Sequence, residues 1–239
     1  MAKQRGPVAS TFSGRVGNVV GAKMKGGEYV TRTYQPSVKN PNTLRQRTSR
    51  LRMATASQVA SGLAPALIAG FGKASGSTNM YPRNMFVRDL VRMDGMEAIT
   101  ITNEVASVDY TKLKMSQRYG ISTLPSMGTP DFEEPMKVTV PYSAVSVVDV
   151  LPEGKMGLVV VVFNPSEQNC VCKMVEASTS SSGSVQVPLP ASYSGAEVYV
   201  YAFLKWIPAT KNDITTEAEP WKYPAETGES VYVGTGEVA

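Results

Sequence analysis

The sequence contains no histidine among its 239 residues. That absence removes the Ser-His-Asp and Cys-His arrangements of nucleophilic catalysis and every histidine-based proton shuttle. Carboxylate or lysine chemistry does not need histidine, but no paired signature of either kind stands out. We therefore expect a protein that is not an enzyme and that uses no cofactor.

Cysteine is almost as scarce, with only Cys170 and Cys172, which form a C-V-C pair. On a strand both side chains would face the same way, but neighbouring same-side positions are poorly placed to form a disulfide. A zinc site would need carboxylates to complete its four ligands. We interpret the pair as two small buried thiols in a strand rather than as a metal or redox site.

Long hydrophobic runs are also missing. The most apolar run, Leu158 to Phe163, is only as long as a strand, and the first residues, MAKQRGPVASTFSG, are charged and then small. None of these segments is long enough for a signal peptide or a membrane span, so we expect a protein made in the cytoplasm that does not meet a membrane. A hydrophobic content of 42% with 18% charged residues is typical of a folded chain.

Acidic residues are nearly absent from the first quarter of the chain. Residues 1–55 hold eleven Lys and Arg against one acid, residues 56–130 hold seven against five, and residues 131–239 hold six against fourteen. The three blocks therefore carry +10, +2 and −8, which sum to the net charge of +4. Either the basic head binds a polyanion such as nucleic acid, or copies of the chain meet head to tail, or the head faces an acidic partner. Composition does not separate these readings.

The basic head begins with an arm, residues 1–13, that we expect to be flexible or extended. Two β-rich runs follow, Arg15 to Met24 and Glu28 to Tyr34, and the turn Lys25-Gly26-Gly27 between them predicts a β-hairpin. The glycines of the first run lack the spacing of a phosphate-binding loop.

A helical region comes next. Asn42 or Thr43 is the predicted cap of a helix over residues 44–61, with Leu44, Leu51 and Val59 on its apolar face. The pattern then predicts a short helix over 66–71, a loop over 74–80, and a helix over 83–92 whose Phe86 and Leu90 face the core.

The first of these helices is rich in arginine. Its first two turns or so carry Arg45, Arg47, Arg50 and Arg52, more than solubility needs. We interpret them as a contact with a partner or a polyanion. The alternative is a solvated basic face that pairs with acids elsewhere in the chain.

The second half of the chain reads as β structure after a Gly/Pro/Ser-rich boundary at Gly120 to Pro135. Short strands separated by turns predict an Ig-like antiparallel β-sandwich, with strands over 136–142, 145–150, 157–163, 170–176, 184–189, 197–204 and 230–234. The expected domains are the arm 1–13, a hairpin-plus-helices domain 14–130 and the sandwich 131–239. The fold class is α+β.

Aromatic residues stand at three notable places in the sandwich. Tyr193 resembles a tyrosine corner before the strand 197–204, in which valines alternate with Tyr199 and Tyr201 on the opposite face. Trp206 is read as a core anchor. Trp221 lies in the acidic loop 212–229, which we expect to be a contact element.

Three motifs together resemble an uncharacterised domain-of-unknown-function family found in gut-bacterial genomes and their phages. They are the glycine-rich run Gly14 to Gly21, the hairpin Lys25 to Arg32, and Lys39 to Thr43 with Gln46 and Arg50; the ending Ser230 to Gly234 is similar to that family's last strand. The resemblance spans nearly the whole chain and implies no activity and no functional residues. Its phage-like setting favours a role in a virion.

These observations predict a non-enzymatic structural component of a phage virion, for example a ring, neck, tail or capsid-associated protein. It would oligomerise through the basic arm and hairpin, and its partners would be other copies of itself and other virion proteins. The alternatives are a nucleic-acid-binding protein that uses the Arg-rich helix and an Ig-like adhesion module. The residues expected to bind partners are Arg15, Lys23, Lys25, Arg32, Arg45, Arg47, Arg50, Arg52 and Trp221.

Overall fold

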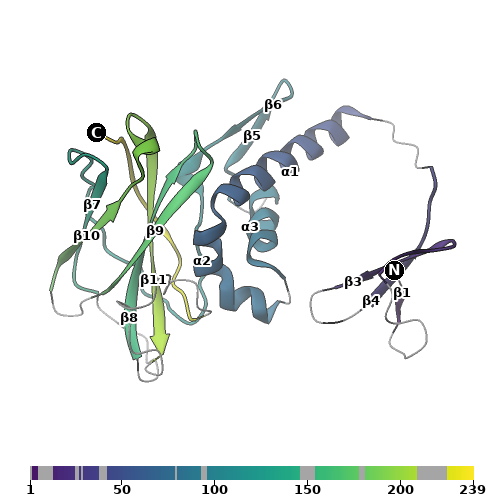
Figure 1. Ribbon diagram of the computed structural model, residues 1–239, viewed down its shortest axis with the longest axis horizontal. Coiled ribbons are helices and arrows are strands. Elements are labelled where there is room, and N and C mark those ends of the chain that lie inside the picture. The colour runs from purple at the N-terminus through teal and green to yellow at the C-terminus, as the bar shows by residue number, and fades with distance from the viewer. Residues whose placement is uncertain are drawn as a thin grey trace.

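The computed structural model describes residues 2–4, 13–24, 27, 29–37, 42–78, 80–92, 96–145, 154–177, 181–208 and 225–239. It is a mixed α+β chain in which a small N-terminal sheet, a group of three helices and a β-sandwich follow one another (Figure 1). The predicted fold class is therefore confirmed.

The N-terminal sheet has four antiparallel strands, β1 (Ala2–Gln4), β2 (Gly14–Val16), β3 (Val19–Lys23) and β4 (Tyr29–Thr33), in the order β1-β4-β3-β2. The hairpin is longer than predicted, because the run Arg15 to Met24 is two strands and not one. The chain reverses at Gly17, whose φ of +57° is a conformation that glycine adopts without steric cost. Part of the expected arm forms β1, which pairs with β4.

The helices are α1 (Leu44–Gly62), α2 (Ala64–Ser77) and α3 (Pro82–Val91). Thr43, and not Asn42, caps α1: its hydroxyl accepts from the Gln46 backbone N–H, and the Gln46 side chain accepts from the Thr43 N–H in return. The predicted loop over 74–80 is wrong at its start, because α2 continues to Ser77. Ala74 is buried in the core, and its burial favours the extra turn.

The predicted apolar face of α1 is also partly wrong. Leu44 is 61% exposed, because the first turns of α1 extend beyond the other helices (Figure 1). The buried face is built later in the helix from Ala56, Val59 and Ala60. In α3, Phe86 and Leu90 are buried as predicted.

A small hairpin follows the helices, β5 (Ile99–Thr102) paired with β6 (Val105–Val108). After Val108 the chain leaves the strand and forms a short 3₁₀ turn, Tyr110–Lys112, which Asp109 caps.

The sandwich contains β7 (Lys137–Tyr142), β8 (Gly154–Asn164), β9 (Asn169–Glu176), β10 (Gly183–Pro188), β11 (Glu197–Pro208) and β12 (Val231–Glu237). One sheet has the order β12-β11-β8-β9 and the other pairs β10 with β7. These are six of the seven predicted strands. Most of the seventh, 145–150, lies outside the described residues.

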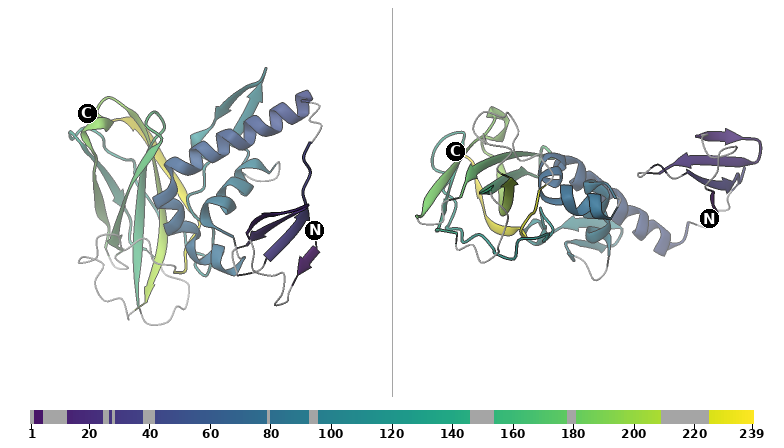
Figure 2. Two further views of the ribbon diagram at one scale, coloured as in Figure 1. Left: turned by 45° about the vertical axis from the view of Figure 1, so that its right-hand side comes forward. Right: turned by 90° about the horizontal axis from the view of Figure 1, so that it is seen from below.

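The four-stranded sheet is the central layer of this part of the molecule. The helices cover one of its faces, and β7 and β10 lie on the other (Figure 2). Strand β11 shows the predicted alternation: Val198, Val200 and Ala202 face the sandwich core, while Tyr201 and Phe203 face the core shared with the helices. Because the helices and the sandwich share this core, they stabilise one another. The boundary near residue 130 stays a prediction.

The remaining structural predictions concern the cysteines and Trp206. Cys170 and Cys172 form no disulfide; both lie on the face of β9 that meets the helices, and Cys172 is buried. Trp206 is buried in the sandwich core as predicted. Tyr193 is buried too, but its hydroxyl donates to the side chain of Asn169 instead of a backbone carbonyl.

Candidate interaction surfaces

The N-terminal sheet presents two different faces. The register places Arg15, Val20 and Arg32 side by side on one face, which we call the arginine face. The opposite face carries Lys23, together with Val16 and Val19, which are 63% and 40% exposed. Three of the predicted contact residues therefore lie on this sheet, two of them on the same face.

Two cations of this sheet lie over aromatic rings. The Arg15 guanidinium lies 3.5 Å from the centre of the Tyr34 ring, and its Nε donates to the Gly17 carbonyl at 3.0 Å. Lys23 Nζ lies 5.9 Å from the centre of the Tyr29 ring. Cation–π contact of this kind holds a charged group in place without neutralising it.

The N-terminal sheet has no core of its own. Of the residues in β2, β3 and β4, only Gly21 is buried, and none of their described side chains belongs to either hydrophobic core. The sheet stands apart from the helices and the sandwich (Figures 1 and 2). Within the described part of the chain, both of its faces are therefore open for contact.

The arginines of α1 do not form one surface. At about 100° per residue, Arg45 and Arg52 fall on one side of the helix while Arg47 and Arg50 fall on the other. Arg47 pairs with Glu104 at 3.1 Å, and Arg52 is half-buried with its Nε out of contact with water. Of these four arginines, only Arg45 and Arg50 are exposed and form no ion pair with a described residue. The two remaining predicted residues, Lys25 and Trp221, lie outside the described part of the chain.

A surface that the sequence analysis did not predict lies on the helix-side face of β11 and β12. It consists of the rings of Tyr110, Tyr199 and Tyr232 beside the carboxylates of Glu197 and Glu237, and we call it the aromatic–acidic patch. The ring centres of Tyr110 and Tyr199 are 5.0 Å apart, and those of Tyr199 and Tyr232 are 6.5 Å apart.

Of the three tyrosines in this patch, only Tyr199 was placed by the sequence pattern. The alternation in β11 placed Tyr199 on the side opposite the valines. Tyr110 and Tyr232 come from segments far away in the chain, and only the fold brings them to the same place. Tyr201 connects them, because its hydroxyl donates to the Tyr110 carbonyl at 2.6 Å.

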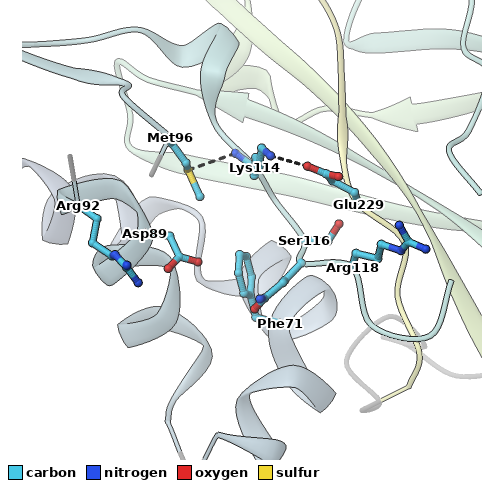
Figure 3. Close-up of a pocket in the computed structure, with 9 residues that line it drawn as sticks. Phe71, Asp89, Arg92, Met96, Lys114, Ser116, Arg118 and Glu229 are labelled. Atoms are coloured by element: carbon cyan, nitrogen blue, oxygen red, sulfur yellow. Dashed lines mark hydrogen bonds and ion pairs between the residues drawn. The ribbon is translucent and has the colours of Figure 1, made fainter. Parts of the chain in front are cut away.

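A pocket of about 430 Å³ lies between α2, the end of α3 and the segment 114–118 (Figure 3). Arg92, Lys114 and Arg118 line it together with Asp89 and Glu229. Lys114 pairs with Glu229, and Asp89 accepts from Arg88 at 2.7 Å. The two carboxylates that line it are therefore already engaged in ion pairs.

One ionisable group is fully buried between the central sheet and α2. Lys205 has no exposed surface, and its Nζ donates to the Ala69 carbonyl at 3.2 Å. Burial lowers the pKa of this amine from 10.5 to about 7, since the interior disfavours the charged form. Because Nζ meets a carbonyl of α2, protonation of this buried amine bears on the stability of the fold.

Two structural findings bear on other classes of function. Within the described part of the chain, no three His, Cys, Asp or Glu side chains gather as a metal site would require. No single described helix is long and apolar enough to span a membrane. Only α1 and the first part of α2 taken together would reach that length, and they are bent by 88°.

Comparison with known proteins places the chain in a family. No curated protein matches the sequence at a significant level. One family model matches residues 11–215, which is most of the chain; the match includes β2 to β11 and ends before β12. The chain therefore belongs to the family of unknown function DUF6266.

Proposed function

We propose that this protein is a non-enzymatic structural component of a phage virion that assembles with copies of itself through its basic N-terminal sheet. The observation that carries the proposal is the sheet itself. It is four strands wide, yet it buries almost nothing. Ordering a residue costs about 1–2 kcal/mol of backbone entropy, and a sheet without a buried face does not recover that cost.

A partner surface would supply what the sheet lacks. Burying the half-buried Val20 and Val30 on one face, or the exposed Val16 and Val19 on the other, would contribute about 25 cal/mol for each Å² of apolar surface removed from water. A sheet that packs against no hydrophobic core of its own chain is typical of arms and hairpins that complete a neighbouring subunit.

The charge distribution supports another copy as the partner. The head carries +10 and the sandwich half −8, so each chain holds both halves of a complementary pair. The virion setting rests on the phage-like occurrence of the family that the motifs resemble. By the same reasoning, the protein would be found in the particle after its synthesis in the host cytoplasm.

The alternative partner is nucleic acid. The structure gives it less support than the sequence did, because the four arginines of α1 are divided between two sides and only two are exposed and unpaired among the described residues. A phosphate-tracking surface needs several cations on one side of the element that meets the backbone.

Light scattering of the purified full-length chain tests the proposal. We expect the mass to rise with concentration to a defined oligomer, and to do so with or without DNA. A chain that remains monomeric at high concentration and joins no particle would overturn the proposal. A monomer whose mass rises only when DNA is added, and falls again as salt rises, would establish the nucleic-acid alternative.

A further inference from the structure

The aromatic–acidic patch holds two carboxylates that face each other without a cation. Glu197 and Glu237 are directly opposite in the antiparallel register of β11 and β12, and both are exposed. Like charges in this position destabilise a pair of strands. Among the described ion pairs, none includes either residue. Glu197 and Glu237 thus form a pair of like charges that a bound cation would neutralise.

The carboxylates also act on the neighbouring hydroxyls of Tyr199 and Tyr232. Burial raises the pKa of Tyr199 and of Tyr232, and Glu197 raises both further. Asp109, just before the 3₁₀ turn, adds to the effect at Tyr232. Asp109 already pairs with Lys112 at 3.5 Å, so the carboxylates of this surface that take part in no described ion pair are those of Glu197 and Glu237.

This chemistry suits a guanidinium group. A guanidinium stacks on a tyrosine face and at the same time donates two parallel hydrogen bonds to a carboxylate. Lysine does the second of these less well, because its ammonium is a compact point charge. Two carboxylates beside a row of rings would accept two arginines.

The arginine face of the N-terminal sheet carries two such groups. Arg15 and Arg32 flank Val20 in register across three neighbouring strands. Both are exposed, and neither forms an ion pair with a described residue. Arg15 already stacks on Tyr34 of its own chain, so it is held in an extended position before any partner arrives.

We propose that the arginine face of one copy docks on the aromatic–acidic patch of a second copy, with Arg15 and Arg32 placed against Glu197 and Glu237. This inference rests on the proposed function, because it names the surface through which copies assemble. Val20 and Val30 would lie over the tyrosine rings and lose their contact with water.

The positions of the two surfaces give the assembly a direction. The N-terminal sheet and the C-terminus, which follows β12 directly, lie at opposite ends of the molecule (Figure 1). A contact between different surfaces of successive copies is heterologous, so it generates a closed ring or an open filament. The opposite charges of the two halves would steer copies into this orientation and speed their encounter.

Charge-reversal variants of the arginine face and of the aromatic–acidic patch test the inference. One variant carries Arg15→Glu and Arg32→Glu, and the other carries Glu197→Arg and Glu237→Arg. Each variant then presents two surfaces of the same sign, so we expect each alone to be monomeric, with association weakened roughly 100-fold. In an equimolar mixture every altered head can meet an altered tail of opposite sign, so light scattering should detect assembly again.

Matched controls separate this interface from general charge effects. Thr33→Glu lies on the other face of the same sheet, opposite Val19 in the register, and Glu133→Arg lies outside the patch; both should assemble like the wild type. Thermal unfolding of each variant checks that the fold is kept. Variants that assemble alone, or a mixture that stays monomeric, would overturn the docking while the wild type still oligomerises. A wild type that never oligomerises would overturn the proposed function as well.

Discussion

At the scale of single residues, the burial of the Lys205 amine lowers the stability of the fold. The amine has no exposed surface and lies between β11 and α2. Its pKa in the folded protein is about 7, whereas the unfolded chain has the ordinary value of 10.5. Between these two values unfolding takes up a proton, so lowering the pH favours the unfolded state. Stability should therefore rise as the pH rises from about 7 toward 10.5.

Replacing Lys205 with methionine should remove this dependence. We expect the free energy of unfolding of the wild type to rise with pH by up to about 1.4 kcal/mol per unit relative to Lys205→Met, with the variant the more stable at neutral pH. Urea unfolding at about pH 7.5, 8.5 and 9.5 measures the difference. Equal slopes for the two proteins would show that Lys205 stays charged in the folded state.

Gly70 marks the closest approach between α2 and the segment that lines the pocket. A Cβ atom at this position would lie 2.1 Å from the Met115 carbonyl oxygen, and that backbone has no space to move aside. Gly70→Ala should therefore destabilise the protein by about 3 kcal/mol or more.

Gly76, in the same helix, provides the matched control. A Cβ atom at this position would have no neighbouring atom within 4 Å, and the residue is exposed, so Gly76→Ala should stabilise by up to about 1 kcal/mol. Thermal unfolding of both variants compares a steric effect with a propensity effect. Similar losses of stability in the two variants would contradict the close approach at Gly70.

At the scale of elements, the start of α1 is an exposed helix end held by one cap. Thr43→Ala removes the hydrogen bond to the Gln46 N–H, which is worth about 1 kcal/mol to the first turn. Because that turn extends beyond the core, we expect local fraying with little change in global stability. Hydrogen exchange at Gln46 and Arg47 should speed up in Thr43→Ala and be nearly unchanged in Thr43→Ser. A large fall in melting temperature would instead show that the first turn supports the core.

The N-terminal sheet should depend on assembly for its order. Its backbone bonds, such as the one from the Tyr34 N–H to the Asn18 carbonyl at 2.7 Å, are covered by no core. Amides in 19–23 and 29–34 should therefore exchange rapidly in dilute protein and slowly in the oligomer. Slow exchange in the monomer would show that the sheet is stable by itself.

The spacing of apolar residues along the chain predicted most of the helices and strands. The alternation of β11, the burial of Phe86 and Leu90, and the strands of the sandwich follow from local patterns, and the resemblance to a family of unknown function is confirmed. The errors have physical causes. Leu44 is apolar but lies on a helix end that nothing covers, and the turn at Gly17 needs only one glycine to divide a strand.

The candidate surfaces were less predictable, because their residues come from segments that only the fold brings together. Arg15 and Arg32 share a face because β3 lies between β2 and β4, a register that spacing alone does not determine. The aromatic–acidic patch joins Tyr110 to residues about a hundred positions later, and no sequence pattern links them. Composition located the charge blocks but not the pairs of side chains that would meet.

At the scale of the whole molecule, the chain separates a basic sheet without a core from a well-packed body with an acidic half. Every described residue of the two hydrophobic cores lies at position 56 or later, so the body has its own support. The sheet has none within one copy. Head-to-tail assembly would unite the two and relieve the opposed carboxylates of β11 and β12.

The mass of the full-length chain, compared with a chain that begins at residue 42, tests this account most directly. Light scattering over the same concentration range should find an oligomer for the full-length protein and a monomer for the shortened one, with both retaining the folded body in thermal unfolding. If both chains reach the same oligomer, or if both stay monomeric, the N-terminal sheet is not the element through which this protein assembles.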